Sequence, residues 1–214
     1  MARRKIGTAH SCFCADIDRL VRLDQQNQSR YRVGPGRPSS GALTKTQMIV
    51  LTEGVLLNAF RCYERFIEEV FILYALGRTS RSGAVAKPFI RPKNADHAVE
   101  LIQSSMNFLE WNSPETIVRR AERYLRDGYP IKSAITADLS LLNDLRWIRN
   151  HIAHNSRESH TRYTKVVHRS LGILPLQIPP AGEFLLLTVP NDPSSYFLLT
   201  YLRGLKRVAD ALTA

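Results

Sequence analysis

A short segment near residue 150 combines three side chains that could act together on a phosphodiester. Arg149, Asn150 and His154 supply a guanidinium, an amide and an imidazole. A guanidinium binds phosphate oxygens through a rigid fork of N–H donors, and an imidazole titrates near neutrality, so it can give or take a proton. An amide can orient either group. These groups suffice for cleavage of RNA without a metal ion, because the 2′-hydroxyl of RNA supplies the nucleophile.

The segment lies at the end of a predicted helix over residues 133–154. At about 100° per residue, the apolar positions of this helix fall on one stripe, formed by Leu141, Leu145, Ile148 and Ile152. Arg146, Arg149, Asn150 and His154 fall on the other flank. Asn150 and His154 are four residues apart and therefore stack on one face. The helix is predicted to present its candidate groups beside a surface that faces the core.

The same residues also have purely structural interpretations. His154 could be a helix-terminal histidine favoured by the helix dipole. Arg149 could pair with Glu64 or Glu68, because a buried carboxylate needs a partner. His151, which is expected to be exposed, forms half a metal site with His154, but no Glu or Cys follows at ligand spacing. No metal and no cofactor is predicted.

The strongest helical pattern covers residues 43–76. Six large apolar residues recur there at steps of three and four, namely Leu56, Phe60, Tyr63, Ile67, Val70 and Tyr74. Gly77 follows at a position where helices often end in a left-handed cap. Because this helix is apolar around much of its girth, we expect it at the centre of the core. Its aromatic residues are expected to be core side chains, not base-stacking platforms.

Caps and turn residues indicate the remaining elements. Helices are expected over residues 10–28, over residues 96–107 after a cap at Asn94 or Asp96, and from Pro114 to about residue 125 after a cap at Ser113. The Pro-rich stretch after residue 171 is expected to be irregular. A final helix over residues 196–212 is preferred to a hairpin between residues 184–189 and 196–201.

These patterns predict an all-α fold, a helical bundle with a Pro-rich C-terminal excursion and a final helix. The glycines and prolines of residues 33–41 mark a loop. Residues 1–41 are therefore expected to be an N-terminal helix and Gly/Pro loop that packs on a domain of residues 42–214.

The charge balance indicates a polyanionic partner. Thirty Lys and Arg residues against nineteen Asp and Glu residues give a net charge of +11 in 214 residues. Residues 78–93 form a basic segment without an acid, and the basic stretch 157–169, which contains His160 and His168, is expected to be a solvated or RNA-facing loop. Loops of this kind should contribute binding, although charge that serves only solubility is the alternative.

Several classes are disfavoured by the sequence. The apolar content of 44% argues against wholesale disorder, and no apolar run approaches the length of a membrane span. No secretory signal, phosphate-binding glycine loop or nucleophile elbow is recognisable. Three cysteines cannot all pair with one another, which favours reduced thiols. We therefore expect a cytoplasmic protein with no membrane partner.

Two segments resemble the HEPN superfamily of ribonucleases, in the branch called RiboL-PSP. The hexapeptide Arg149-Asn150-His151-Ile152-Ala153-His154 resembles its Arg-x4-His signature, in which a polar residue, often Asn, follows the Arg. Residues 56–71 are similar to the long helix of that branch, where an acidic residue precedes an aromatic-rich stretch. One position departs from the pattern. Some toxin branches carry a Tyr two residues after the His, where this chain has Ser156, so no modification or antitoxin contact through that Tyr is expected.

The resemblance implies a HEPN-like helical bundle and a homodimer whose two motifs face each other in a composite active site. It also implies metal-independent cleavage of RNA by the toxin or effector of a bacterial toxin–antitoxin or phage-defence system, with an antitoxin or regulatory partner. Arg149, Asn150 and His154 would be catalytic, and Glu64 and Arg146 would support them. The alternative is a non-catalytic HEPN-like module that binds nucleic acid or a partner protein through its basic loops.

Overall fold

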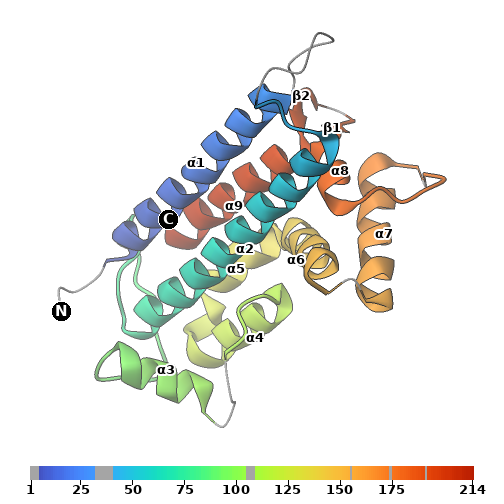
Figure 1. Cartoon of the computed structure of the whole chain (residues 1–214). Coiled ribbons are helices and arrows are strands. Elements are labelled where there is room, and N and C mark those ends of the chain that lie inside the picture. The colour runs from blue at the N-terminus through green and yellow to red at the C-terminus, as the bar shows by residue number, and fades with distance from the viewer. Residues whose placement is uncertain (1–4, 32–40, 105–108, 155, 174, 191) are drawn as a thin grey trace. The chain divides into compact units, whose positions relative to one another are not determined.

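A computed structural model describes residues 5–31, 41–104, 109–154, 156–173, 175–190 and 192–214. Within these ranges the chain is mostly helical, with nine α-helices and one antiparallel hairpin (Figure 1). The helices are α1 (Ile6–Tyr31), α2 (Lys45–Ala75), α3 (Ala95–Gln103), α4 (Pro114–Tyr124), α5 (Ile131–Ala137), α6 (Leu139–His154), α7 (Arg157–Leu171), α8 (Ala181–Leu186) and α9 (Phe197–Thr213). The strands are β1 (Thr188–Val189) and β2 (Asp192–Tyr196). The predicted helical class is confirmed at this level.

The chain divides into two compact units, and neither is continuous in sequence. The first unit contains Met1–Ala15, Arg61–Asn143 and Gly204–Ala214. The second contains Asp16–Phe60 and Asp144–Arg203. Residues 33–40 of the predicted Gly/Pro loop lie outside the described residues, and the predicted division at residue 41 stays a prediction.

The predicted helix starts are confirmed by their capping bonds. The side chain of Asn94 accepts a hydrogen bond from the backbone N–H of His97 at 2.8 Å, at the start of α3. Ser113 Oγ accepts one from the N–H of Thr116 at 3.4 Å, and Pro114 occupies the first position of α4. Both caps satisfy a backbone donor that has no partner inside its helix. Helix α3 ends at Gln103, and residues 105–107 of its predicted extent lie outside the described residues.

The aromatic residues of α2 are core residues, as predicted. Phe60, Tyr63, Phe66 and Phe71 are all less than 4% exposed. In the first unit the Phe66 ring stacks on Phe13 of α1 with the centroids 4.5 Å apart, and the Phe71 ring lies 5.1 Å from that of Trp111. Such ring pairs stabilise a core beyond the free energy of apolar burial.

One predicted helix is divided in the structure. The helix expected over residues 133–154 is two helices, α5 and α6, which are separated by Asp138 in a non-helical conformation. The Asp138 carboxylate accepts hydrogen bonds from Arg207. Aspartate is a poor helix former because its side chain competes for local hydrogen bonds.

The predicted basic loop over residues 157–169 is wrong, because this stretch is helix α7. Its cap is Ser156, whose Oγ accepts a hydrogen bond from the backbone N–H of Ser159 at 3.2 Å. The helix ends at Gly172, which has a left-handed φ of 69°. Its buried side chains recur at helical spacing, at Tyr163, Val166 and Val167. His160 and His168 therefore lie on a helix, where both are exposed.

The C-terminal region contains the preferred final helix and a shorter hairpin than the predicted alternative. Strands β1 and β2 pair with Thr188 opposite Tyr196, and the final helix α9 begins at the next residue. The preferred final helix is thus confirmed, whereas residues 184–186, one end of the alternative hairpin, are helical in α8.

Candidate functional site

Three of the predicted residues line one pocket of the second unit. Arg146, Asn150 and His154 follow one another at steps of four along α6, which places them on one face of that helix. Trp147 completes the α6 wall. The pocket has a volume of about 240 Å³.

The opposite wall comes from the start of α7, the stretch for which the sequence predicts a loop. It consists of Ser156, Glu158, Ser159 and Arg162. The first turn of a helix carries partial positive charge from its unpaired backbone N–H groups. The helical pattern of Tyr163, Val166 and Val167 after a serine cap is the signal that could have revealed that this stretch is a helix.

Arg149 does not line this pocket but is bonded to a residue that does. Its Nη1 donates a hydrogen bond to Asn150 Oδ1 at 3.0 Å. Its Cζ lies 5.8 Å from the centroid of the Phe60 ring, within the range of a cation–π contact. Arg149 therefore holds the amide of Asn150 by its oxygen, which leaves the amide N–H groups of Asn150 for other partners.

The pocket has a positive balance. Arg146 and Arg162 supply two guanidinium groups, and His154 supplies an imidazole. The only carboxylate among the lining residues is that of Glu158, which accepts a hydrogen bond from Arg162 Nη2 at 2.7 Å. His154 is exposed at the end of α6, so its imidazole can exchange protons with solvent. This set of groups suits an anion together with a proton transfer.

Two contacts between α6 and α7 support the pocket. Asp144, which is buried, accepts a hydrogen bond from Arg169. Burial raises the pKa of the Asp144 carboxyl, and the Arg169 guanidinium counteracts this rise. The ring of His151 stacks on that of Tyr163 with the centroids 4.5 Å apart. These contacts fix the two helices whose adjoining ends form the pocket.

His151 is partly buried, which corrects the expectation that it is exposed. Its ring centroid lies 5.4 Å from that of His160 on α7. Burial lowers the pKa of His151, and the nearby His160 lowers it further. His151 therefore has a packing role beside the pocket and favours the neutral form.

Glu64 belongs to the first unit, where it lines a pocket of about 420 Å³ together with Arg61, Arg65 and Glu68. Arg149 belongs to the second unit. The pairing of Arg149 with Glu64 or Glu68 thus stays a prediction.

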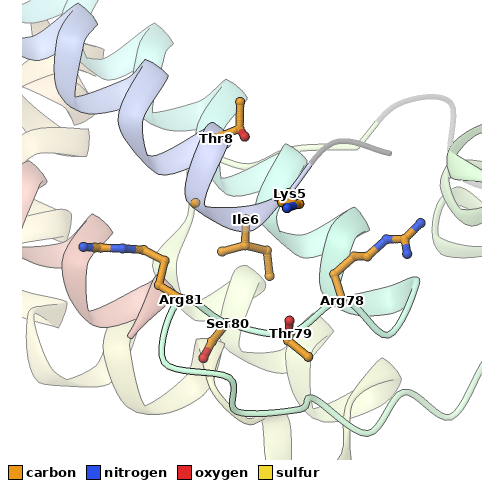
Figure 2. A pocket seen from close by; sticks show the side chains of 8 residues that line it. Lys5, Ile6, Thr8, Arg78, Thr79, Ser80 and Arg81 are labelled. Carbon is orange, nitrogen blue, oxygen red and sulfur yellow. The ribbon is translucent and has the colours of Figure 1, made fainter. Parts of the chain in front are cut away.

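A larger pocket of about 590 Å³ lies on the first unit (Figure 2). It is lined by the start of α1 and by residues 78–81. Figure 2 shows the side chains of Arg78 and Arg81 pointing to opposite sides. Arg81 donates to Asp210 at 3.3 Å and contacts His10 at 3.0 Å through the same Nη1. The residues that line this larger pocket include no histidine and no carboxylate.

Comparison with protein-family models, with curated proteins and with solved structures gives no match for this chain. In the part of the chain that the structure describes, no three His, Cys, Asp or Glu side chains gather as a metal site would require. Likewise, none of the described helices is both long and apolar enough to cross a bilayer.

Proposed function

We propose that this chain is a metal-independent endoribonuclease that cleaves RNA by transesterification at the pocket between the ends of α6 and α7. The observation that carries this proposal is the meeting of His154, Asn150 and two guanidinium groups in one small pocket. The groups of this pocket match what cleavage of a phosphodiester requires, namely positive charge beside the phosphate and a group that carries a proton.

In the proposed reaction the 2′-oxygen of RNA attacks the adjacent phosphorus and the 5′-oxygen of the next nucleotide leaves. The 2′-hydroxyl loses a proton, and the leaving oxygen gains one. His154 carries one of these two transfers, and its exposure allows it to return to its starting state through solvent. The products are a 2′,3′-cyclic phosphate and a 5′-hydroxyl.

The three arginines have two different roles in the proposed reaction, which are binding of the phosphate and positioning of Asn150. Arg146 and Arg162 line the pocket and would bind the scissile phosphate, whose negative charge grows during attack. Arg149 would act on Asn150, because its hydrogen bond fixes the amide oxygen and turns the amide N–H groups to the substrate. In this proposal Arg149 is a positioning residue.

The wider expectations from the HEPN resemblance are part of the same proposal. A mostly helical fold with the Arg-x4-His motif at the end of α6 is compatible with a HEPN-like bundle. A homodimer with facing motifs would bring a second imidazole to the site, for the second proton transfer. The cellular role would be that of a bacterial toxin or defence effector that an antitoxin or other partner restrains.

The test is incubation of the purified chain with a labelled RNA in the presence of a chelator. Products ending in 2′,3′-cyclic phosphate are expected, and a matched strand with 2′-deoxy nucleotides should stay intact because it lacks the nucleophile. A His154→Ala protein purified in parallel controls for contaminating nucleases. Intact RNA that still binds the chain would contradict the proposal and favour a non-catalytic binding module.

A further inference from the structure

The first unit carries a basic surface that lies outside the candidate active site. Arg119 and Arg123 of α4 and Arg126 of the following turn recur at steps of four and three, and all three are exposed. Lys87 and Phe89 come from the segment that precedes α3 and are also exposed. These five residues are called the α4 surface below.

Backbone hydrogen bonds join the two segments of the α4 surface. The N–H of Phe89 donates to the carbonyl of Tyr124 at 2.9 Å, and the N–H of Arg126 donates to the carbonyl of Lys87 at 2.9 Å. The surface is therefore a fixed arrangement and not a chance approach of mobile side chains. Figure 1 shows α3 next to α4, and a groove of about 210 Å³ between them is lined by Arg119, Arg123 and Tyr124.

The cations of the α4 surface are available for a ligand. Within the described residues, Lys87, Arg119 and Arg123 form no ion pair, and Arg126 has only Asp127 at 4.0 Å. Glu122, the acid within α4 nearest to them in sequence, is held by Lys132 at 2.6 Å. Two further exposed cations, Arg91 and Lys93, follow Phe89 along the chain. Such an excess of unpaired positive charge attracts a polyanion.

Phe89 gives this surface a feature that charge alone does not explain. Phe89 as a residue is 63% exposed, although its backbone N–H is hydrogen-bonded to α4. An aromatic ring on a basic surface offers a platform on which an unstacked base can lie. A duplex keeps its bases stacked inside, so a free ring favours a single strand.

We propose that the α4 surface binds single-stranded RNA, with its arginines on successive phosphates and Phe89 under one base. The choice of RNA rests on the proposed function, whereas the surface itself is argued from its own charges and from the ring. Its role is to hold the strand, and it takes no part in bond cleavage.

The first experiment measures anisotropy of a labelled single-stranded 2′-O-methyl RNA, which offers no free 2′-hydroxyl for cleavage. The triple variant Arg119→Gln/Arg123→Gln/Arg126→Gln is compared with Arg19→Gln/Arg22→Gln/Arg203→Gln, which removes three exposed charges from the second unit. Loss of three phosphate contacts should reduce the slope of log affinity against log salt by about 2. The control variant should keep the parental slope. Equal slopes for the two variants would overturn the proposal.

The second experiment tests the ring. Phe89→Ala should weaken binding between about five- and 100-fold and leave the salt slope unchanged, because stacking carries no charge. Phe89→Trp should retain binding, whereas Phe89→Leu, which is apolar but cannot stack, should behave like Phe89→Ala. Unaltered thermal melting would show that these variants fold, as expected for so exposed a side chain.

Further outcomes would overturn the choice of ligand. If Phe89→Ala weakens binding of an RNA duplex by the same factor as binding of single-stranded RNA, Phe89 does not stack on an unpaired base. If a DNA strand of the same sequence binds more tightly, RNA is the wrong occupant. Failure here is distinguishable from failure of the proposed function: a chain that cleaves RNA but binds it without the α4 surface refutes only this inference.

Discussion

Arg149 and Asn150 are neighbours in sequence and are also joined through their side chains, by a hydrogen bond of 3.0 Å from Arg149 Nη1 to Asn150 Oδ1. This bond uses one of the two lone pairs of the amide oxygen and holds the amide by that oxygen, while the two N–H donors of Asn150 can serve the pocket. Two motif residues that resemble independent catalytic groups in the sequence therefore form one unit in the structure.

This bond makes Arg149 and Asn150 energetically coupled. Arg149→Ala and Asn150→Ala should each lower the rate of RNA cleavage, and the double variant should be little slower than the worse single variant. A double-mutant cycle on the cleavage rate measures the coupling, with Arg157→Ala, an exposed arginine of α7 outside the pocket lining, as a matched control. Fully additive losses would mean that Arg149 acts separately from Asn150.

His154→Ala should reduce the cleavage rate by about 10²–10⁴, which is the usual worth of a general acid or base. Stability should change by at most about 2 kcal/mol, since a histidine at a helix end contributes mainly through the dipole. His168→Ala removes an exposed histidine from α7 and should keep the parental rate. If expression of the parent is toxic, His154→Ala should also relieve that toxicity. Parental cleavage by a folded His154→Ala protein would refute the catalytic role.

The stability of the second unit should depend on pH through His151. Burial lowers the pKa of His151 in the folded chain, so the unfolded chain binds the proton more readily. The free energy of unfolding should consequently fall as pH drops from about 6.5, the ordinary pKa of histidine, toward the lower folded value. Denaturant melts at pH 7.5 and 5.5 measure this loss, which His151→Gln should diminish and His168→Gln should not. The same pH dependence in all three proteins would assign the effect to other groups.

Two glycines should respond to alanine in opposite directions. A Cβ on Gly182 of α8 would lie 2.4 Å from the carbonyl oxygen of Ile49 in α2, so Gly182→Ala should destabilise the chain by about 1–3 kcal/mol. A Cβ on Gly54 of α2 would meet no neighbouring group within 4 Å among the described residues, and Gly54→Ala should stabilise the helix by about 0.4–1 kcal/mol. Chemical denaturation of the two variants checks both signs. A neutral Gly182→Ala would show that α8 can move away from α2.

A homodimer is expected if the composite site is correct. Each pocket supplies one imidazole, whereas the proposed reaction needs two proton transfers. Light scattering at micromolar concentration should therefore give twice the chain mass, and mixing His154→Ala chains with parental chains should lower activity more than dilution does. A monomer that cleaves RNA would contradict the dimer and leave the pocket's chemistry intact.

The sequence predicts local features of this chain better than the walls of its pocket. Asn94 and Ser113 are recognisable as caps because a cap depends on residues within one turn. The helical wheel likewise groups Arg146, Asn150 and His154, because they share one helix. A wheel relates positions within a single helix only, so it could not show that α7 supplies the opposite wall.

The sequence also could not predict in which direction individual side chains point or which partners they meet. Arg149 lies on the expected flank of α6, yet its guanidinium turns to Phe60 and Asn150, as the packing around it requires. The Asp138 carboxylate likewise accepts a hydrogen bond from Arg207, sixty-nine positions further along the chain. Both outcomes depend on tertiary contacts that no local pattern contains.

Because the first unit consists of three separate segments of the chain, it cannot be completed on the ribosome until its last segment has been translated. The hydroxyl of buried Tyr74 donates to the carbonyl of Leu212 at 2.7 Å, and the N–H of Arg81 donates to that of Thr213 at 2.8 Å. These acceptors are made only after the whole of Asp144–Arg203 has been translated, which takes roughly 3–12 s. During that interval the nascent first unit lacks its last segment, and its apolar interior is open to chaperones or to misassembly.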